Sequence, residues 1–589
     1  MAGSWEPLLF RVRRDGSDGY TPTAEQRADY QAEHSPEMVA RLKAMGVNFV
    51  MMHCYKGAGL EAERQSMADA VRFARLCHDQ GLRVGVYNYS GAFIWDLFFK
   101  EVPAAKDWVV YDARGTPQGY GKAATYRYYW NRNHPDAEAF YRQLVRFAVQ
   151  EIRTDLIHFD NYNVGPGHDA NSIERFRDYL RRAFTPAMLR EAGVADLSAV
   201  RPPGTDSPPL LRHAWDEFRC RSITDSYHAM SRYARTLRPD ILVECNPAGV
   251  GARITPPVNH GQLLKGGEAF WDEGLESGFA NGKLKSRIRT YKVARAMDNS
   301  AFCYSTTPLE MAESMAFNLD CLGAICWFEY GRITKRPGFA EPMSPDLAPF
   351  VRFFHQRRDL LRNAEVVADV AVLRSFPSQV FAGSKPAALT YQVEEQLIGN
   401  RVCFQIIYDH QLAQLRKYRA LVLAGCVAMS NAQIEAIKTY VNSGGRLCVI
   451  GPAATHDEWM QPRAKAALDD LPAARVLRVA EKDNSLEAIR RVCGSELSLT
   501  VDAPAGVCAE LTGQPGRRLL HLVNYRAEAT AKNVSARVRV PSGRRAQAVA
   551  LASPQRAQEL KIPFTQADDF VTFTVPEIPV YEIAVISVK

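Results

Sequence analysis

Residues 156–163 read Leu156-Ile157-His158-Phe159-Asp160-Asn161-Tyr162-Asn163, a short apolar run followed at once by polar and aromatic side chains. A brief apolar run of this kind is typical of a buried strand in a parallel sheet. Asp160 follows that run, and its neighbours cannot continue a buried core. We therefore predict a strand that ends at one edge of a sheet, with Asp160 as the leading candidate for a catalytic carboxylate there.

Short apolar runs alternate with longer amphipathic runs over the first 330 residues or so, which predicts parallel strands joined by helices. We expect further strands at residues 46–53, 83–89, 241–245, 267–270, 301–305 and 323–328, and one more within 91–134. A helix over 346–362 closes this part of the chain. Eight strands in this length predict an α/β domain over residues 1–362 with the (β/α)8 fold of a TIM barrel.

Two further domains are predicted after residue 362. Residues 363–483 contain four buried-type strands, which predicts a flavodoxin-like, doubly wound sheet: 370–373, 402–407, 420–424 and 447–450. No G-x-G-x-x-G sequence follows the first of these strands, so we expect no dinucleotide. From about residue 484 the apolar residues repeat with a period of two, which predicts a C-terminal antiparallel β-sandwich over 484–589.

Composition and motifs exclude several function classes. The net charge is +8, but no basic stripe stands out, so we expect no nucleic-acid partner. No segment approaches the ~20 apolar residues of a membrane span, so we expect no membrane partner. The twelve cysteines lack C-x-x-C spacing and residues 1–16 lack a signal-peptide core, which favours a cytoplasmic protein. No metal-ligand, phosphate-loop or serine-hydrolase motif occurs, so we expect no metal and no cofactor.

Carboxylate, amide and aromatic side chains follow the predicted strands, at the edge where a (β/α)8 barrel has its active site. Sugars offer hydroxyl groups for hydrogen bonds and apolar faces for stacking, so this mixture predicts a carbohydrate site. Glycoside hydrolysis uses two carboxyl groups, and the catalytic candidates are Asp160, Glu244 and Glu268. The residues expected to bind substrate are His53, Lys56, Tyr87, Asn88, His158, Asn161, Asn246, Trp271, Asp272, Glu273, Trp327 and Glu329.

Each of these residues also has a structural interpretation. Asp160 could cap the following helix or pair with a buried arginine, and Glu244 could belong to a structural salt bridge. Glu268, Asp272 and Glu273 compete with Glu244 for the role of the acid, and each could instead be a loop carboxylate. A lone histidine near a strand end, such as His53 or His158, is often a satisfied structural group.

The middle of the chain resembles the trimerisation domain of family 42 β-galactosidases and related hypothetical glycosyl hydrolases. The resemblance lies in Asp369-Val370-Ala371-Val372-Leu373 and in residues 418–423 and 440–447, while 520–525 is similar to the C-terminal β domain of those enzymes. The resemblance implies a glycosidase that acts on an oligosaccharide or glycoside and forms a homo-oligomer, a dimer or a trimer.

Family 42 enzymes carry an Asn-Glu pair after the fourth strand, where this chain has Asp160-Asn161. An aspartate at this place looks more like the α-amylase-type and α-galactosidase-type barrels. That likeness implies a retaining, exo-acting enzyme with Asp160 as nucleophile and Glu244 as acid/base, the sixth-strand cluster being the alternative acid. Two other hypotheses stay open: a non-catalytic sugar-binding or assembly protein on a glycosidase scaffold, and a sugar isomerase or lyase.

Overall fold

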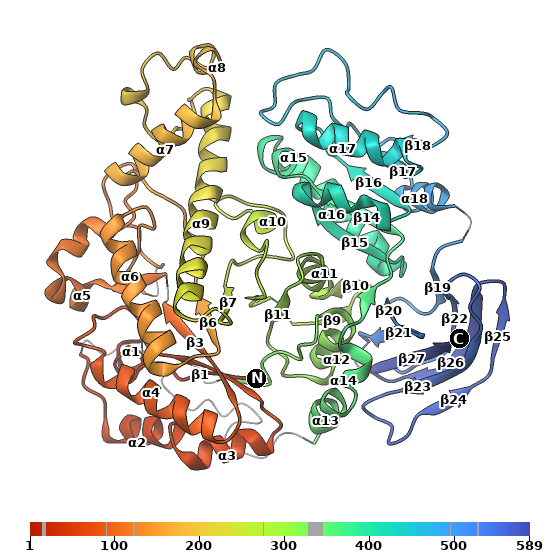
Figure 1. Ribbon diagram of the computed structural model, residues 1–589, viewed down its shortest axis with the longest axis horizontal. Helices are drawn as coiled ribbons and strands as arrows, with labels where there is room; N and C mark the ends of the chain where they lie inside the picture. The colour runs from red at the N-terminus through yellow and green to blue at the C-terminus, as the bar shows by residue number, and fades with distance from the viewer. Residues whose placement is uncertain are drawn as a thin grey trace. The chain divides into compact units, whose positions relative to one another are not determined.

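The computed structural model describes residues 1–14, 19–89, 91–121, 124–274, 276–327, 345–494, 496–526 and 529–589 (Figure 1). The chain divides into two compact units. Unit 1 comprises residues 1–248, 255–271 and 324–344, and unit 2 comprises 249–254, 272–323 and 345–589. Among the described residues, no helix is both long enough and apolar enough to cross a membrane.

Unit 1 is built on a curled sheet of seven parallel strands in the order β8-β7-β6-β3-β2-β1-β12. Each strand therefore lies beside its predecessor in the chain, and the last strand lies beside the first, as in the wall of a (β/α)8 barrel. This order confirms the barrel-type fold. The strands are β1 (Ala2–Ser4), β2 (Phe49–His53), β3 (Arg83–Tyr89), β6 (Leu156–Phe159), β7 (Leu242–Cys245), β8 (Ala269–Trp271) and β12 (Cys326–Trp327).

Helices connect the successive strands of unit 1. The helix α4 (Arg64–Asp79) buries Met67, Ala70, Phe73, Ala74 and Cys77, which form one apolar face. The other helices are α1 (Leu8–Arg14), α2 (Ala24–Glu33), α3 (Pro36–Ala44), α5 (Trp95–Glu101), α6 (Pro135–Phe147), α7 (Ala170–Ala183), α8 (Pro186–Glu191), α9 (Pro209–Leu237) and α10 (His260–Leu263).

Two predictions about the strands of unit 1 are corrected. The first strand is β1, whereas the sequence predicts the first strand at residues 46–53. The strand β1 was missed because three residues at the start of the chain show no periodicity. The third strand expected within 91–134 is instead a hairpin, in which β4 (Ala92–Ile94) pairs with β5 (Arg127–Tyr129) in the antiparallel direction. The two errors offset each other, so Leu156–Phe159 is the fourth parallel strand as expected.

Unit 2 contains a five-stranded parallel sheet in the order β15-β14-β16-β17-β18, which confirms the doubly wound middle part. Its strands are β14 (Val370–Arg374), β15 (Phe404–Tyr408), β16 (Ala420–Ala424), β17 (Arg446–Ile450) and β18 (Val476–Val479). The helices α16 (Ser384–Gly399), α17 (Asn431–Asn442) and α18 (Ser485–Cys493) connect or follow them. Ser430 caps α17 in a capping box with Gln433.

The C-terminal part of unit 2 holds two antiparallel sheets, in the orders β13-β20-β21-β27-β23-β24 and β19-β22-β26-β25. Apolar side chains from both sheets form one buried core, which confirms the sandwich. The strands are β13 (Glu365–Val366), β19 (Leu499–Asp502), β20 (Val507–Gln514), β21 (Arg517–Asn524), β22 (Ala531–Arg539), β23 (Ala546–Ala552), β24 (Leu560–Ile562), β25 (Phe564–Ala567), β26 (Phe570–Ile578) and β27 (Tyr581–Val588).

Unit 2 also includes a segment that the sequence analysis assigns to the first domain. This segment contains α11 (Ile288–Ala296), β11 (Ser300–Phe302) and α12 (Pro308–Phe317), followed later in the chain by α13 (Ala348–Gln356). The division into domains at residues 1–362, 363–483 and 484–589 stays a prediction, since the two units follow a different division.

Candidate active site

Asp160 lies directly after β6 and is 8 % exposed. Its carboxylate accepts hydrogen bonds from the backbone N–H of Asn161 (2.9 Å to Oδ1), from Asn161 Nδ2 (2.7 Å to Oδ2) and from Asn246 Nδ2 (3.3 Å to Oδ1). Asn161 has a φ of 52°, the left-handed conformation in which a short amide side chain can bond locally. The residues after β6 and β7 thus hold the Asp160 carboxylate from two strands.

His158 lies between Asp160 and Glu244. His158 and Glu244 are register partners in β6 and β7, so their side chains meet on one face of the sheet. His158 Nδ1 is 2.7 Å from Glu244 Oε1, and His158 Nε2 is 3.6 Å from Asp160 Oδ1. Both side chains of the His158–Glu244 pair are fully buried. The three groups form a chain of alternating charge that begins at Asp160.

The charges of Glu244 and His158 determine the ionisation of Asp160. Burial works against a charged imidazole, but Glu244 and Asp160 outweigh it and raise the pKa of His158 to about 9. His158 is therefore protonated at neutral pH. Burial also works against the Asp160 carboxylate, but His158, followed by Lys56 and Arg127, lowers its pKa below the ordinary value. The site keeps Asp160 ionised and able to act as a nucleophile or as a base.

Tyr87 in β3 lies between two histidine rings. Its ring centroid is 3.7 Å from that of His158 and 4.2 Å from that of His53. His53 Nδ1 lies 2.7 Å from the carbonyl oxygen of Ser4, so Nδ1 carries the proton in this contact. Burial, followed by the nearby Lys56 charge, lowers the pKa of His53 well below its ordinary value. His53 is therefore neutral, and its unprotonated Nε2 is buried.

Glu244 and Glu268 do not occupy the positions expected of an acid/base. The Glu244 residue has no exposed surface, and His158 separates its carboxyl group from Asp160, so a substrate cannot touch it in this conformation. Glu268 precedes β8 at the amino end of the strand, whereas Asp160 follows the carboxyl end of β6. Glu268 pairs with Arg235 and accepts the backbone N–H of Val243. Both glutamates thus have structural contacts.

The remaining predicted residues are placed as follows. Lys56 is buried and pairs with Glu6 Oε1 at 3.3 Å. Asn88 points away from Tyr87, because side chains alternate along a strand, and its amide faces the Leu144 and Val145 backbone in α6. Trp271 is fully buried in β8 and offers no surface for stacking.

Four predicted residues do not contribute to the described part of this site. Asp272 and Glu273 belong to unit 2, where Asp272 is buried and accepts a hydrogen bond from Thr290 Oγ1 at 2.6 Å, while Glu273 is exposed. The side chain of Trp327 and the whole of Glu329 lie outside the described residues.

Three neighbours of this site were missed by the sequence analysis. Tyr120 accepts a hydrogen bond from Asn161 Nδ2 at 3.0 Å, Arg127 starts the hairpin strand β5, and Glu6 follows β1. These residues come from very short strands or from an irregular stretch, which leave no periodic signal. The one available signal is the density of Trp and Tyr within residues 91–134.

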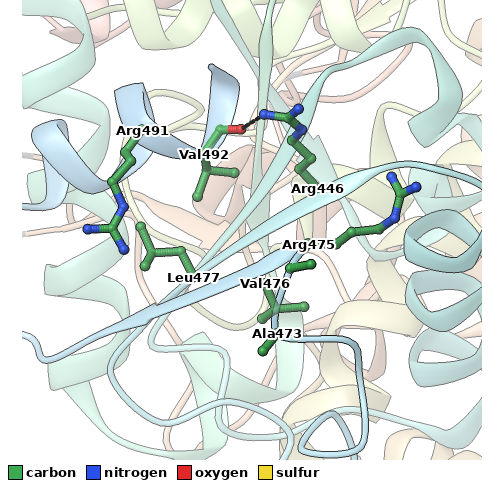
Figure 2. A pocket seen from close by; sticks show the side chains of 8 residues that line it. Arg446, Ala473, Arg475, Val476, Leu477, Arg491 and Val492 are labelled. Carbon is green, nitrogen blue, oxygen red and sulfur yellow. Dashed lines mark hydrogen bonds between the residues drawn. The ribbon is translucent and has the colours of Figure 1, made fainter. Parts of the chain in front are cut away.

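Unit 2 has a hollow of about 160 Å³ whose lining differs chemically from the surroundings of Asp160 (Figure 2). Its lining consists of arginine and apolar residues, and the Arg446 guanidinium donates a hydrogen bond to the Val492 carbonyl oxygen at 3.0 Å. A lining without carboxyl groups cannot hydrolyse a glycoside by the two-carboxylate route. The candidate active site is the Asp160 region of unit 1, where the carboxylate meets amide and imidazole groups from β6 and the residue after β7.

Comparisons with known proteins agree with this fold. No family model matches the chain, and no curated protein matches it by sequence. Among solved structures, a catalytic mutant of Gan42B, a GH42 β-galactosidase from G. stearothermophilus, has a TM-score of 0.72 and 12 % identity over 96 % of this chain and 97 % of its own. The β-galactosidase from Bacillus circulans sp. alkalophilus has a TM-score of 0.71 and 12 % identity, covering 96 % and 98 % of the two chains.

A third similar structure is the α-L-fucosidase isoenzyme 2 from Paenibacillus thiaminolyticus. It has a TM-score of 0.68 and 14 % identity, covering 94 % of this chain and 96 % of its own. The likeness to all three structures extends over nearly the whole length of each chain. This chain therefore has the multidomain fold of the GH42-like glycoside hydrolases.

Proposed function

We propose that this protein is a glycoside hydrolase of the retaining, exo-acting type, with Asp160 as its nucleophile. The observation that carries the proposal is the environment of Asp160. Its carboxylate follows the fourth parallel strand, and amide donors from two strands hold it. The His158–Glu244 pair keeps it ionised. A carboxylate held in this way is suited to attack at an anomeric carbon.

The proposed reaction has two steps. In the first, an Asp160 oxygen forms a bond to the anomeric carbon, the glycosidic C–O bond breaks, and a carboxylic acid gives a proton to the leaving oxygen. In the second step water attacks the same carbon, the Asp160 ester bond breaks, and the conjugate base of that acid takes the proton from water. We assign this acid role to none of the predicted carboxyl groups of Glu244, Glu268, Asp272 and Glu273, whose placement is described above.

We assign Glu244 a positioning role rather than the predicted acid/base role. It holds the proton on His158 Nδ1, and the charged imidazole in turn favours the Asp160 carboxylate. A carboxyl group without exposed surface can act on the reaction only through such a neighbour.

The test is hydrolysis of a panel of nitrophenyl α- and β-glycosides by the full chain and by Asp160→Asn. We expect the substitution to lower kcat by about 1,000-fold or more, because an amide cannot form the glycosyl ester. A 2-deoxy-2-fluoro glycoside of the preferred sugar should add one glycosyl group to Asp160, detected by mass spectrometry of peptides. Asp178→Asn, which changes an exposed aspartate in α7, is the matched control and should keep full activity.

Unchanged turnover in Asp160→Asn would overturn the proposal. The second candidate is a sugar-binding or assembly protein on the same scaffold. It is favoured by two observations in unit 1: Glu244 is shielded, and Glu6 is paired with Lys56 and Arg14. Tight binding of sugars by the wild type, with no hydrolysis of any glycoside in the panel, would decide for this second candidate.

We further propose that the protein is a cytoplasmic homo-oligomer, a dimer or a trimer. All twelve cysteines are free and eleven of them are buried, which suits a reducing compartment. The family 42 resemblance of the middle part supports assembly. Light scattering on the purified chain measures the number of subunits, and a monomer at micromolar concentration would contradict the proposal.

A further inference from the structure

Three cationic side chains surround the ring of Phe10 in unit 1. Arg14 Cζ is 4.4 Å, Lys56 Nζ 4.8 Å and Arg127 Cζ 5.3 Å from the ring centroid. They come from α1, from the loop after β2 and from the hairpin strand β5. We call these four residues, with Glu6, the Phe10 cluster.

Glu6 is the carboxylate within this cluster. It accepts two hydrogen bonds from Arg14, both at 2.9 Å, and it pairs with Lys56 at 3.3 Å. Arg127 forms no ion pair with any residue in the described ranges. One carboxylate therefore serves two of the three cations, and Arg127 has no carboxylate within ion-pair distance among the described residues.

Arg127 is also short of hydrogen bonds. The residue is 3 % exposed, and its Nε and Nη2 atoms are buried without an acceptor among the described residues. A buried charged donor without a partner is costly, so a ligand that accepts its hydrogen bonds would be favoured. The guanidinium has a planar fork of donors that matches two oxygens of a carboxylate or a sulfate. The missing partner thus has the chemistry of an oxyanion.

The position of Arg127 connects it to Asp160. The Arg127 guanidinium lies 3.8 Å from the ring centroid of Tyr120, whose hydroxyl accepts a hydrogen bond from Asn161 Nδ2. Asn161 in turn donates to Asp160. Tyr120 is partly exposed and its ring stacks on the guanidinium, so Tyr120 lies between Arg127 and the residues that hold Asp160.

We infer that Arg127, supported by Lys56, forms a subsite for an anionic substituent, a carboxylate or a sulfate ester, on the sugar that Asp160 attacks. The substrate class is then an acidic glycan, such as a uronic acid or a sulfated sugar. The sugar part of this inference rests on the proposed function, whereas the anion subsite rests on Arg127 itself. The positive charges of Arg127 and Lys56 would bind an acidic sugar more tightly than a neutral one.

Binding to the full chain, measured by isothermal titration calorimetry, tests the inference without catalysis. The ligands are D-galacturonate, D-galactose 6-sulfate and D-galactose, with the matching gluco series. We expect one type of acidic sugar to bind about 10- to 100-fold more tightly than its neutral counterpart, as for hydrogen bonds to charged groups. The better of the two acidic types identifies the substituent as carboxylate or sulfate.

Three variants locate the effect. Arg127→Gln should abolish the preference for acidic over neutral sugars, and Arg127→Lys should keep part of the preference because it keeps the charge. Arg142→Gln, an exposed arginine paired with Glu138 in α6, is the matched control and should bind like the wild type. If Arg127→Gln does not fold, Arg127→Lys and the wild type decide the question in the same way.

The inference is overturned if no acidic sugar binds better than its neutral counterpart, or if the folded Arg127 variants keep the full preference. It is also overturned if inorganic sulfate alone binds as tightly as the sulfated sugar, because the subsite then holds an adventitious ion only. Failure of the proposed function looks different: acidic sugars bind through Arg127, but no glycoside of the panel is hydrolysed.

Discussion

Two buried charge clusters, one in each unit, differ in how completely their polar atoms are paired. In unit 2, Arg374 and Glu394 form a bidentate pair at 2.8 Å, and Arg374 also donates to the carbonyl oxygens of Val250, Gly251 and Ala252. Arg289 completes the shell of Glu394 at 3.0 Å. In unit 1, buried polar atoms lack hydrogen-bond partners among the described residues: His53 Nε2, His158 Nε2, Glu244 Oε2, and Nε and Nη2 of Arg127.

The difference separates a structural role from a functional one. A fully paired buried cluster has no free donors or acceptors for a ligand. It serves the fold, because removal of one partner leaves the other as an uncompensated buried charge. A partly paired cluster costs stability in the free protein and regains it when a substrate supplies the missing partners. The two clusters therefore differ in the pairing of their polar atoms and not in the burial of their charges.

The largest effect is expected from Arg374→Met. The substitution leaves Glu394 buried without its bidentate partner, so it should lower the free energy of unfolding by about 3–5 kcal/mol. Differential scanning calorimetry should show this as a lower Tm of the transition of unit 2. The double variant Arg374→Met/Glu394→Leu should recover part of the loss, since it removes both charges. A Tm of Arg374→Met equal to that of the wild type would contradict the structural role of this cluster.

The next effect concerns the pH dependence of hydrolysis. The pKa of His158 is raised to about 9, so the imidazole is charged below pH 9. Above that pH the imidazole loses its charge and no longer favours the ionised form of Asp160. Glu244→Gln removes an anion that favours the imidazolium, so the pKa of His158 should fall. The alkaline limb of kcat/KM should therefore move toward lower pH by about one unit or more.

The control for this prediction is Glu138→Gln, which changes a partly exposed glutamate in α6. It should keep the pH profile of the wild type. If Glu244→Gln lowered kcat at every pH without moving either limb, Glu244 would not act through the charge of His158, and the positioning role would be wrong.

The contrast between the clusters also explains how much of the site the sequence could predict. Asp160 and His158 could be predicted because His158 belongs to a clear apolar strand and Asp160 directly follows it. The barrel topology then fixes the edge of the sheet at which that strand ends. Asn88 was misplaced because a strand position one residue from Tyr87 faces the helix layer. Whether Glu244 is shielded depends on the register of β6 with β7, which a strand pattern does not contain.

Arg127 and Glu6 could not be predicted for a different reason. Their strands β5 and β1 have only three residues each, so neither shows a measurable period. The fold class was predictable, since long alternating patterns and the order of the three parts carry it. Pairing of individual polar atoms is a property of the packed structure, and it is this pairing that distinguishes the two clusters.

The smallest effect is expected from Arg127→Met, the counterpart of Arg374→Met in unit 1. Methionine keeps much of the contact of the arginine stem with Tyr120 and Phe10 but removes the unpaired charge. The cation–π contacts that are lost and the desolvation cost that is relieved oppose each other, so the free energy of unfolding should change by less than about 1 kcal/mol in either direction. The same calorimetric scan measures it as a nearly unchanged Tm of unit 1. A loss of about 3 kcal/mol or more, similar to that of Arg374→Met, would mean that Arg127 already has its partners within the chain. The Phe10 cluster would then be a paired structural cluster, like that of Arg374 and Glu394.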